Sequence, residues 1–299
     1  MARPLMILKR YVWIINTLKM YGPISFTDIQ KLWINDRISE GIKWVRQTFA
    51  RYKNDVEEYF GIDIAVDNRY RYYITDIKPL QLDTVANWIL NSFTIGETLG
   101  HKKEIQERII MEPTPAVGPF MEGITDAMVN KKKIVITYQQ YGENEVKEYK
   151  LIPYFIKLCH QRWHLIGMKE DGKMMLFTFS GINSMKTTDE TFEYDMKIKA
   201  KEYFEDCFSV IRDETKPAVR IVLRAYGLEA NYIRDRRLHH SQRELSICDD
   251  YTDFELFLRP SADVLTEILG RGNRVKVLEP AHLAQEVREM HEKSLKMYE

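Results

Sequence analysis

Hydrophobic residues recur at helical spacing through the first 78 residues of the chain. The first such run ends at Gly22-Pro23, a second begins after the expected N-cap Ser25, and a third ends at Gly61. Their apolar positions are, in chain order, Leu5, Leu8, Val12, Ile15, Leu18, Ile29, Leu32, Trp33, Phe49, Val56 and Phe60. Two alternating segments follow and predict a β-hairpin that turns at Asp67-Asn68. Three helices and then a hairpin indicate a winged helix-turn-helix over residues 1–78.

The outer flank of the third helix is cationic. Residues 1–78 hold 13 Lys and Arg against 9 Asp and Glu, and no acid lies between Arg46 and Asn54. A DNA major groove admits one helix, whose Arg and Gln side chains can meet base edges, while hairpin arginines meet phosphates. The DNA-contacting candidates are Arg46, Gln47, Thr48, Ala50, Arg51 and Lys53 on the helix, with Arg69 and Arg71 on the hairpin. The alternative is an ordinary solvated helix face.

The middle of the chain changes from helical to alternating periodicity. Residues 79–133 form a connector with two helical segments, 82–100 and 118–133, separated by the breaker "EPTPAVGP". From residue 134 the segments are strand-like and joined by turns at Gly142-Glu143 and Asp171-Gly172. Short strands with no helix between them predict a small SH3-like or Sm-like β-barrel over residues 134–195.

The last part of the chain mixes helices and strands. After a linker at residues 196–215, segments in the order β-α-β-β-α-β predict a ferredoxin-like domain over residues 216–299. An additional amphipathic helix at the end is available to pack on this domain or on a second subunit. The expected fold class is therefore α+β with several domains.

Composition and motifs exclude several classes of protein. The 299 residues include 44 Lys and Arg and 44 Asp and Glu, so net charge identifies no partner. Three widely spaced cysteines predict reduced thiols rather than disulfides or a zinc module, and lysines interrupt the apolar run at the N-terminus. We therefore expect a cytoplasmic protein without a membrane span, metal or cofactor.

An enzyme is also not expected, because no phosphate loop or metal-spaced His pair occurs. The adjacent histidines of "LHHSQRE" (238–244) fit a helix end better than a catalytic pair, with a basic patch as the alternative.

Three stretches resemble one known architecture. The segment "IPYFIKLCHQRWHLIG" followed by "LFTFSGI" resembles the WYL domain, an Sm-like barrel named for a Trp-Tyr-Leu triplet. The segment "RQTFARYKNDVEEYFGIDI" is similar to the winged helix that precedes many WYL domains, and residues 216–299 are similar to their WCX-type extension. This resemblance implies a bacterial transcription regulator that binds operator DNA as a homodimer. It also implies a ligand resembling a nucleotide or nucleic-acid fragment and, for some members, repression of phage-defence operons.

Residue by residue, the resemblance is uneven. Positions that match the family pattern are Pro153, Tyr154, Lys157, Gln161, Arg162, Trp163 and Leu165. His164 stands in place of the triplet's Tyr, Ser180 and Gly181 replace an Asp-Arg pair, and an apolar residue near Met175 replaces another Arg. The missing arginines put an anionic ligand in question.

The strand around the triplet supplies the ligand-binding candidates. Alternation directs Trp163 and Leu165 to the core, and Arg162 and His164 to a shared solvent face where a phosphate could accept hydrogen bonds from both. The candidates are Tyr138, Lys157, His160, Arg162 and His164, and the alternative for His164 is a surface imidazole hydrated by water. The expected function is a ligand-responsive transcription regulator, which the resemblance implies is a repressor. The alternative is a non-catalytic nucleotide-binding or nucleic-acid-binding module of a defence or repair system.

Overall fold

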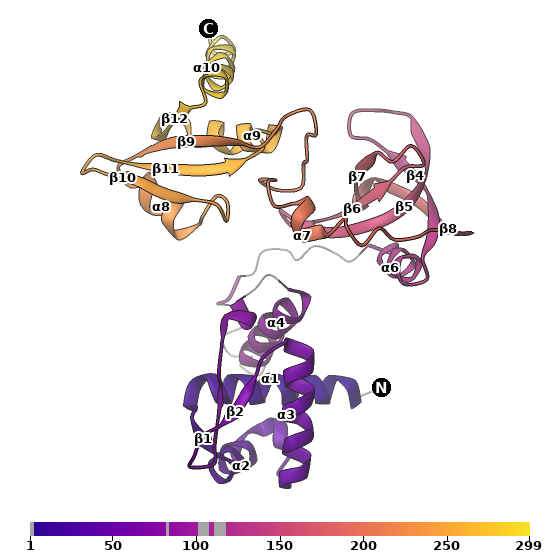
Figure 1. Ribbon diagram of the computed structural model, residues 1–299, viewed down its shortest axis with the longest axis vertical. Coiled ribbons are helices and arrows are strands. Elements are labelled where there is room, and N and C mark those ends of the chain that lie inside the picture. Colours follow the sequence, from indigo (N-terminus) through magenta and orange to yellow (C-terminus); the bar gives the residue numbers. More distant parts are fainter. Residues whose placement is uncertain (1–2, 82–83, 101–107, 111–117) are drawn as a thin grey trace. The chain divides into compact units, whose positions relative to one another are not determined.

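The computed structural model describes residues 3–81, 84–100, 108–110 and 118–299, and the predicted breaker lies largely outside them. The chain divides into two compact units, Met1–Glu112 and Pro113–Glu299, coloured from indigo to magenta and from magenta to yellow in Figure 1. No helix among the described residues is both long and apolar enough to cross a membrane.

The first unit contains the three expected helices and the expected hairpin, with a fourth helix packed on α1 and α3. Strand β3 lies at the centre of a small antiparallel sheet, in the order β1-β3-β2. The elements are α1 (Arg3–Tyr21), β1 (Ile24–Ser25), α2 (Phe26–Asn35), the 3-10 helix Arg37–Ser39, α3 (Arg46–Phe60), β2 (Ile64–Val66), β3 (Arg71–Ile74), the 3-10 helix Lys78–Gln81 and α4 (Val85–Gly100).

Aromatic side chains hold the first unit together. Trp33 stacks on Trp44 with ring centroids 3.9 Å apart, and Trp13 meets both rings edge-on. As predicted, Ser25 caps α2 by accepting a hydrogen bond from the Asp28 N–H, and α3 ends at Gly61 in the left-handed conformation. Trp44 was not among the expected core positions, because it stands alone in the loop before α3.

A five-stranded antiparallel sheet follows in the second unit, in the order β7-β6-β5-β4-β8. Its long strand β5 is shared by both halves of the sheet and has a bulge between Pro153 and Phe155. The polar strand β8 was not predicted, since its sequence lacks the alternation of its neighbours. The elements are α6 (Met121–Val129), β4 (Lys132–Gln139), β5 (Val146–Cys159), β6 (Arg162–Met168), β7 (Met174–Thr178), the 3-10 helix Phe179–Gly181 and β8 (Ile182–Thr191).

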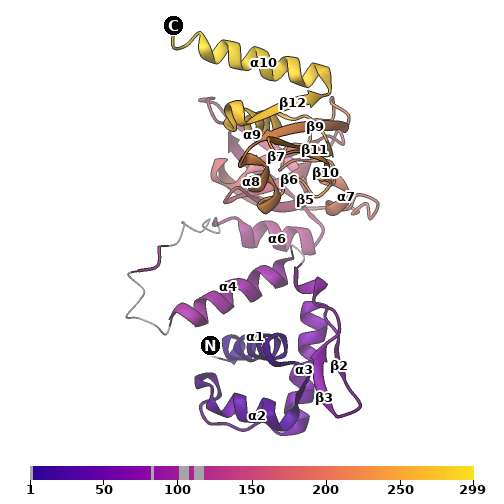
Figure 2. The ribbon, with the colours of Figure 1, turned by 90° about the vertical axis from the view of Figure 1, so that its left-hand side faces the viewer.

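The final part of the second unit has the predicted order β-α-β-β-α-β. Its antiparallel sheet has the strand order β10-β11-β9-β12, and Ile221, Leu223, Phe254 and Leu256 are buried on the face that packs with α8 and α9. The last helix, α10, lies beside β12 (Figure 2). The elements are α7 (Ala200–Tyr203), β9 (Val219–Tyr226), α8 (Glu229–Asp235), β10 (Arg243–Ile247), β11 (Tyr251–Leu258), α9 (Ala262–Gly270), β12 (Val275–Glu279) and α10 (Ala281–Leu295).

Candidate functional site

The first turns of α3 present unpaired cationic side chains to solvent. Phe49, Tyr52 and Val56 bury one side of the helix, which leaves Arg46, Gln47, Ala50 and Arg51 exposed and Thr48 half-buried. Among the described residues, the guanidinium groups of Arg46 and Arg51 have no hydrogen bond or ion pair. Each lies instead against an aromatic ring, Arg46 at 5.4 Å from the Phe26 centroid and Arg51 at 5.1 Å from that of Tyr52. These rings support the arginines while leaving their charge uncompensated.

Lys53 differs from this group. It is half-buried, and its Nζ donates to Glu57 Oε2 at 2.6 Å and to the backbone oxygen of Ile64 at 3.3 Å. Glu57 Oε1 accepts the backbone N–H of Ile64 at 2.8 Å. The expectation that Lys53 belongs to the outer flank therefore does not hold: Lys53 and Glu57 join α3 to the first strand of the hairpin.

The hairpin tip is organised by Asp67. Its carboxylate accepts the backbone N–H groups of Arg69 and Arg71, both at 2.9 Å, and the Nε–H of Arg71 at 2.8 Å. The backbone hydrogen bond from Arg71 is the main reason that the pKa of Asp67 is lowered. The Arg71 guanidinium is thus neutralised locally, whereas Arg69 and the neighbouring Tyr70 are exposed. Tyr70 was not among the residues singled out from the sequence, because only its position in the turn indicates that it is exposed beside Arg69.

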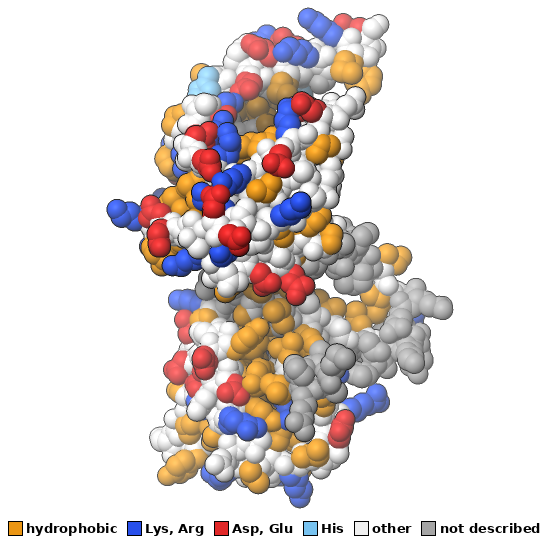
Figure 3. Space-filling model, turned by 90° about the vertical axis from the view of Figure 1, so that its right-hand side faces the viewer, with side chains coloured by type: hydrophobic (Ala, Val, Ile, Leu, Met, Phe, Trp, Pro, Cys, Tyr) orange, Lys and Arg blue, Asp and Glu red, His pale blue; other side chains and the backbone are white. Residues whose placement is uncertain are grey.

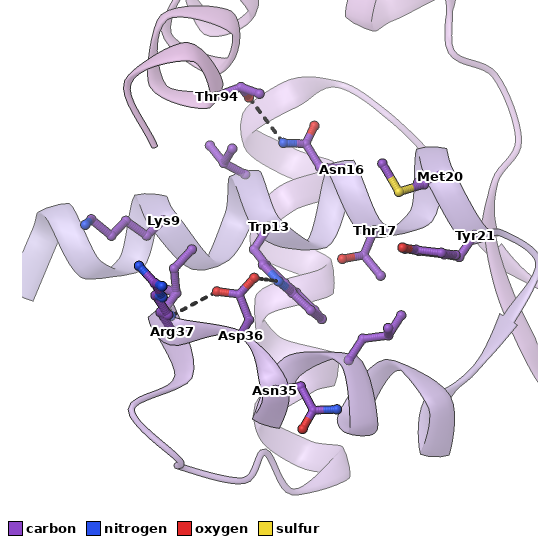
Figure 4. A pocket seen from close by; sticks show the side chains of 13 residues that line it. Lys9, Trp13, Asn16, Thr17, Met20, Tyr21, Asn35, Asp36, Arg37 and Thr94 are labelled. Atoms are coloured by element: carbon purple, nitrogen blue, oxygen red, sulfur yellow. Dashed lines mark hydrogen bonds between the residues drawn. The ribbon is translucent and has the colours of Figure 1, made fainter. Parts of the chain in front are cut away.

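A cavity of about 540 Å³ lies on another part of the first unit (Figure 4). Asp36 accepts a hydrogen bond from Trp13 Nε1 at 3.0 Å, and Asn16 Nδ2 donates to Thr94 Oγ1 at 3.2 Å. These bonds link α1 to the end of α2 and to α4. None of the DNA-contacting candidates lines this cavity, so we treat it as separate from that surface.

In the second unit, the face predicted to bind a ligand is covered by the chain itself. Tyr203 and Phe204 pack on Phe155, and Lys157 Nζ lies 4.0 Å from the Phe204 ring centroid and donates to the backbone oxygen of Ser209. Residues 203–209 are called the covering segment below. Burial lowers the pKa of Lys157, as expected for a cation withdrawn from water.

The prediction that His164 faces solvent is wrong. His164 lies directly opposite Lys157 in the β5–β6 register, on the same face, and is only 8% exposed. Its Nδ1 has no hydrogen-bond partner among the described residues, and burial lowers its pKa. Strand alternation was read correctly, but residues classed as a linker fold back and exclude this face from water.

Tyr138 and His160 are also separated from a common site. The Tyr138 ring packs edge-on against Phe177, and its hydroxyl accepts the Thr178 N–H at 3.4 Å, so the side chain is part of the core. His160 lies in the β5–β6 turn with a left-handed φ of 46° and lines a cavity with Asp263 and Arg271. The five predicted ligand residues therefore do not form one cluster.

A separate cavity lies at the start of β6, and Arg162 is the only one of those five residues that lines it. The cavity has a volume of about 630 Å³ and is bordered by Gly118, Pro119, Phe120, Gln161, Arg162, Trp163, Thr178, Phe179, Ser180, Ile182 and Asn183. Arg162 is exposed, and its guanidinium has no hydrogen bond or ion pair within the described residues. Sequence reasoning assigned Trp163 to the core and did not single out Thr178 or Asn183, because they join Arg162 only when β6, β7 and β8 assemble.

The adjacent histidines of residues 238–244 have structural roles. His240 Nε2 is 2.7 Å from the backbone oxygen of Glu205, so this ring anchors the covering segment. His239 Nδ1 lies 2.7 Å from Ser241 Oγ, and burial, followed by the charge of His240, lowers the pKa of His239 to about 4.

The surface of the second unit is electrostatically mixed. On the face in Figure 3, blue and red side chains are interspersed over this unit rather than gathered by sign. Ion pairs such as Arg220 with Glu255 and Arg224 with Asp253 bring charges of opposite sign together on the second unit. Within the described ranges, no three His, Cys, Asp or Glu side chains are grouped so that they could hold a metal ion.

Two family models match the second unit. Residues 119–187 match the WYL domain and residues 216–295 match the WCX domain, which confirms that part of the resemblance. The WYL match begins before α6, a helix that lies within the predicted connector. No curated protein is significantly similar to this chain.

Two solved structures are distantly similar. Proteasome accessory factor B/C (PafBC) of Arthrobacter aurescens is 16% identical with a TM-score of 0.36, and the match covers 96% of this chain and 46% of that one. This chain thus spans less than half of the PafBC chain. A CRISPR Cas-related protein is 12% identical with a TM-score of 0.42, over 98% of this chain and 85% of the other.

Proposed function

We propose that this protein is a ligand-responsive transcription regulator, and specifically a repressor. In this proposal the first unit is a winged helix-turn-helix that binds operator DNA, and the protein acts as a homodimer. The WYL domain, an Sm-like barrel, binds a nucleotide-like ligand, and the WCX domain is its ferredoxin-like extension. The protein carries out no catalysis of its own.

The observation that carries the proposal is the set of uncompensated guanidinium groups on adjoining elements. Arg46 and Arg51 on α3 and Arg69 on the hairpin are exposed without an ion partner in the described residues, and Gln47 lies beside them. Several surface cations of the second unit are paired with nearby acids, for example Arg220 with Glu255 and Arg234 with Glu244. Unpaired arginines beside a glutamine suit phosphate oxygens and base edges, which accept bidentate hydrogen bonds.

The second unit supports the sensing half of the proposal. Its cavity at Arg162 is open to solvent-borne molecules and contains one cation that no acid among the described residues neutralises. Occupancy of this cavity would change DNA affinity only by the difference in ligand affinity between the DNA-bound and free states. A homodimer would place two recognition helices on half-sites separated by whole helical turns, about 10–10.5 base pairs or a multiple.

The test begins with selection of duplex fragments by the purified full-length protein. We expect one palindromic sequence to be enriched and its affinity to fall steeply with salt, because several cations displace counterions from phosphate. Arg51→Ala should weaken this binding by about 10-fold to 100-fold in a mobility-shift titration. A duplex affinity that depends neither on DNA sequence nor on salt concentration would favour the accessory-module alternative.

Arg162→Ala separates the two halves of the proposal. We expect operator affinity to be unchanged and the response to ligand to be reduced. The reverse pattern would contradict the assignment of sensing to the second unit.

A further inference from the structure

We infer that the cavity at Arg162 binds a nucleoside monophosphate, in preference to nucleoside polyphosphates and nucleic-acid fragments. This inference deepens the proposed function and rests on its ligand-sensing half. It concerns the charge and shape of the molecule that the cavity accepts.

Arg162 is the only charged side chain among the described residues that line the cavity. The other polar groups come from the neutral side chains of Gln161, Thr178, Ser180 and Asn183. One guanidinium can form a bidentate pair with one phosphate group, but a second and third phosphate would enter without a compensating cation. The charge of the cavity therefore suits a single phosphate.

No side chain at position 181 can add a second cation. A Cβ on Gly181 would lie 2.6 Å from Tyr138 Cε2, 2.9 Å from Tyr138 Cζ and 3.0 Å from the backbone oxygen of Gln139. Tyr138 cannot easily yield, because its ring packs against both Phe177 and Tyr149. The packing around position 181 therefore requires glycine in this chain and leaves no room for the arginine that the WYL pattern has there.

The walls of the cavity suit a planar base. Trp163, Phe120 and Phe179 supply aromatic surface, on which a base can stack. The Nε1–H of Trp163 is buried and has no hydrogen-bond partner among the described residues, so a ligand acceptor that reaches it satisfies a donor left unused by the fold. The exposed amide of Asn183 can both donate to and accept from a base edge.

The experiment measures binding to the full-length protein by titration calorimetry in the absence of DNA. The probes are the four common ribonucleoside 5′-monophosphates, their nucleosides and triphosphates, inorganic phosphate and a single-stranded decanucleotide. At least one monophosphate should bind about 10-fold to 100-fold more tightly than its nucleoside, the range expected for one charge-assisted pair. Its triphosphate should bind no more tightly, and inorganic phosphate should give no heat of binding.

Two variants locate the site. Arg162→Gln should remove the preference for monophosphate over nucleoside, whereas Lys186→Gln, which removes one charge from β8 outside the cavity, should keep it. Trp163→Phe removes the Nε1–H and part of the aromatic surface but no charge, and should weaken nucleoside and monophosphate binding equally. Circular dichroism melting of each variant verifies the fold.

The inference is overturned if no monophosphate binds, if a triphosphate or the decanucleotide binds more than 10-fold more tightly, or if Arg162→Gln leaves the preference intact. Failure of the DNA-binding half has a different signature. In that case monophosphate binding and its dependence on Arg162 persist, while the mobility-shift titration shows no sequence-specific complex.

Discussion

The two arginines of α3 and Lys157 of the β5–β6 face began as similar candidates and have opposite surroundings. Arg46 and Arg51 are exposed and unpaired, whereas Lys157 is desolvated beneath Phe204 and donates to the chain itself. Periodicity within one element correctly indicates which side chains share a face. Whether that face meets water depends on segments far away in the sequence, here residues 203–209. The comparison teaches that exposure to water and hydrogen-bond partners separate binding candidates from structural cations better than position on a strand or helix.

The largest effect should separate paired from unpaired cations on the first unit. Arg46→Gln with Arg51→Gln should weaken operator binding about 100-fold or more, because two contacts of about 1–3 kcal/mol each are lost. Lys53→Gln with Arg71→Gln removes the same charge but from groups already bound to Glu57 and Asp67, and should cost less than about 10-fold. Mobility-shift titrations at one salt concentration measure both. Equal losses of operator affinity in the two double variants would contradict the distinction between paired and unpaired cations.

Acid should destabilise the second unit through its buried imidazoles. The pKa of His239 is about 4 in the folded protein against about 6.5 in an unfolded chain, so the unfolded chain binds an extra proton between these values. The stability that the neutral, buried His239 contributes is therefore fully present above pH 6.5. This contribution, up to about 3 kcal/mol of unfolding free energy, is lost as pH falls toward 4. Denaturant unfolding across this range checks the slope. His239→Gln should flatten it, and the exposed His282→Gln should not.

Packing at Gly181 should have a smaller but distinct cost. Gly181→Ala pushes a methyl group against the Tyr138 ring and the Gln139 carbonyl, and should destabilise the protein by about 1–3 kcal/mol. Gly270→Ala, where an added Cβ meets no atom within 4 Å, is the control. Thermal unfolding of both proteins gives the difference. A silent Gly181→Ala would remove the packing explanation for the missing arginine.

The sequence predicted the local features that depend on neighbouring residues. The Ser25 cap, the end of α3 at Gly61 and the turns at Gly142 and Gly172 all follow from residue types with strong backbone preferences. Burial of His164 could not be predicted in this way, because it depends on the return of the linker to β5 and β6. The cavity at Arg162 was equally hidden, since its walls come from β6, β7, β8 and the segment before α6.

The bridge between Lys53, Glu57 and Ile64 has a practical consequence for engineering. Because these bonds fasten the hairpin to the interior side of α3, they use none of the outward positions at 46, 47, 50 and 51. Those four positions can be randomised together in a library without loosening the scaffold that carries them. Under the proposed function, variants with new DNA-sequence preferences should be obtainable from one helix, with the rest of the domain left as it is.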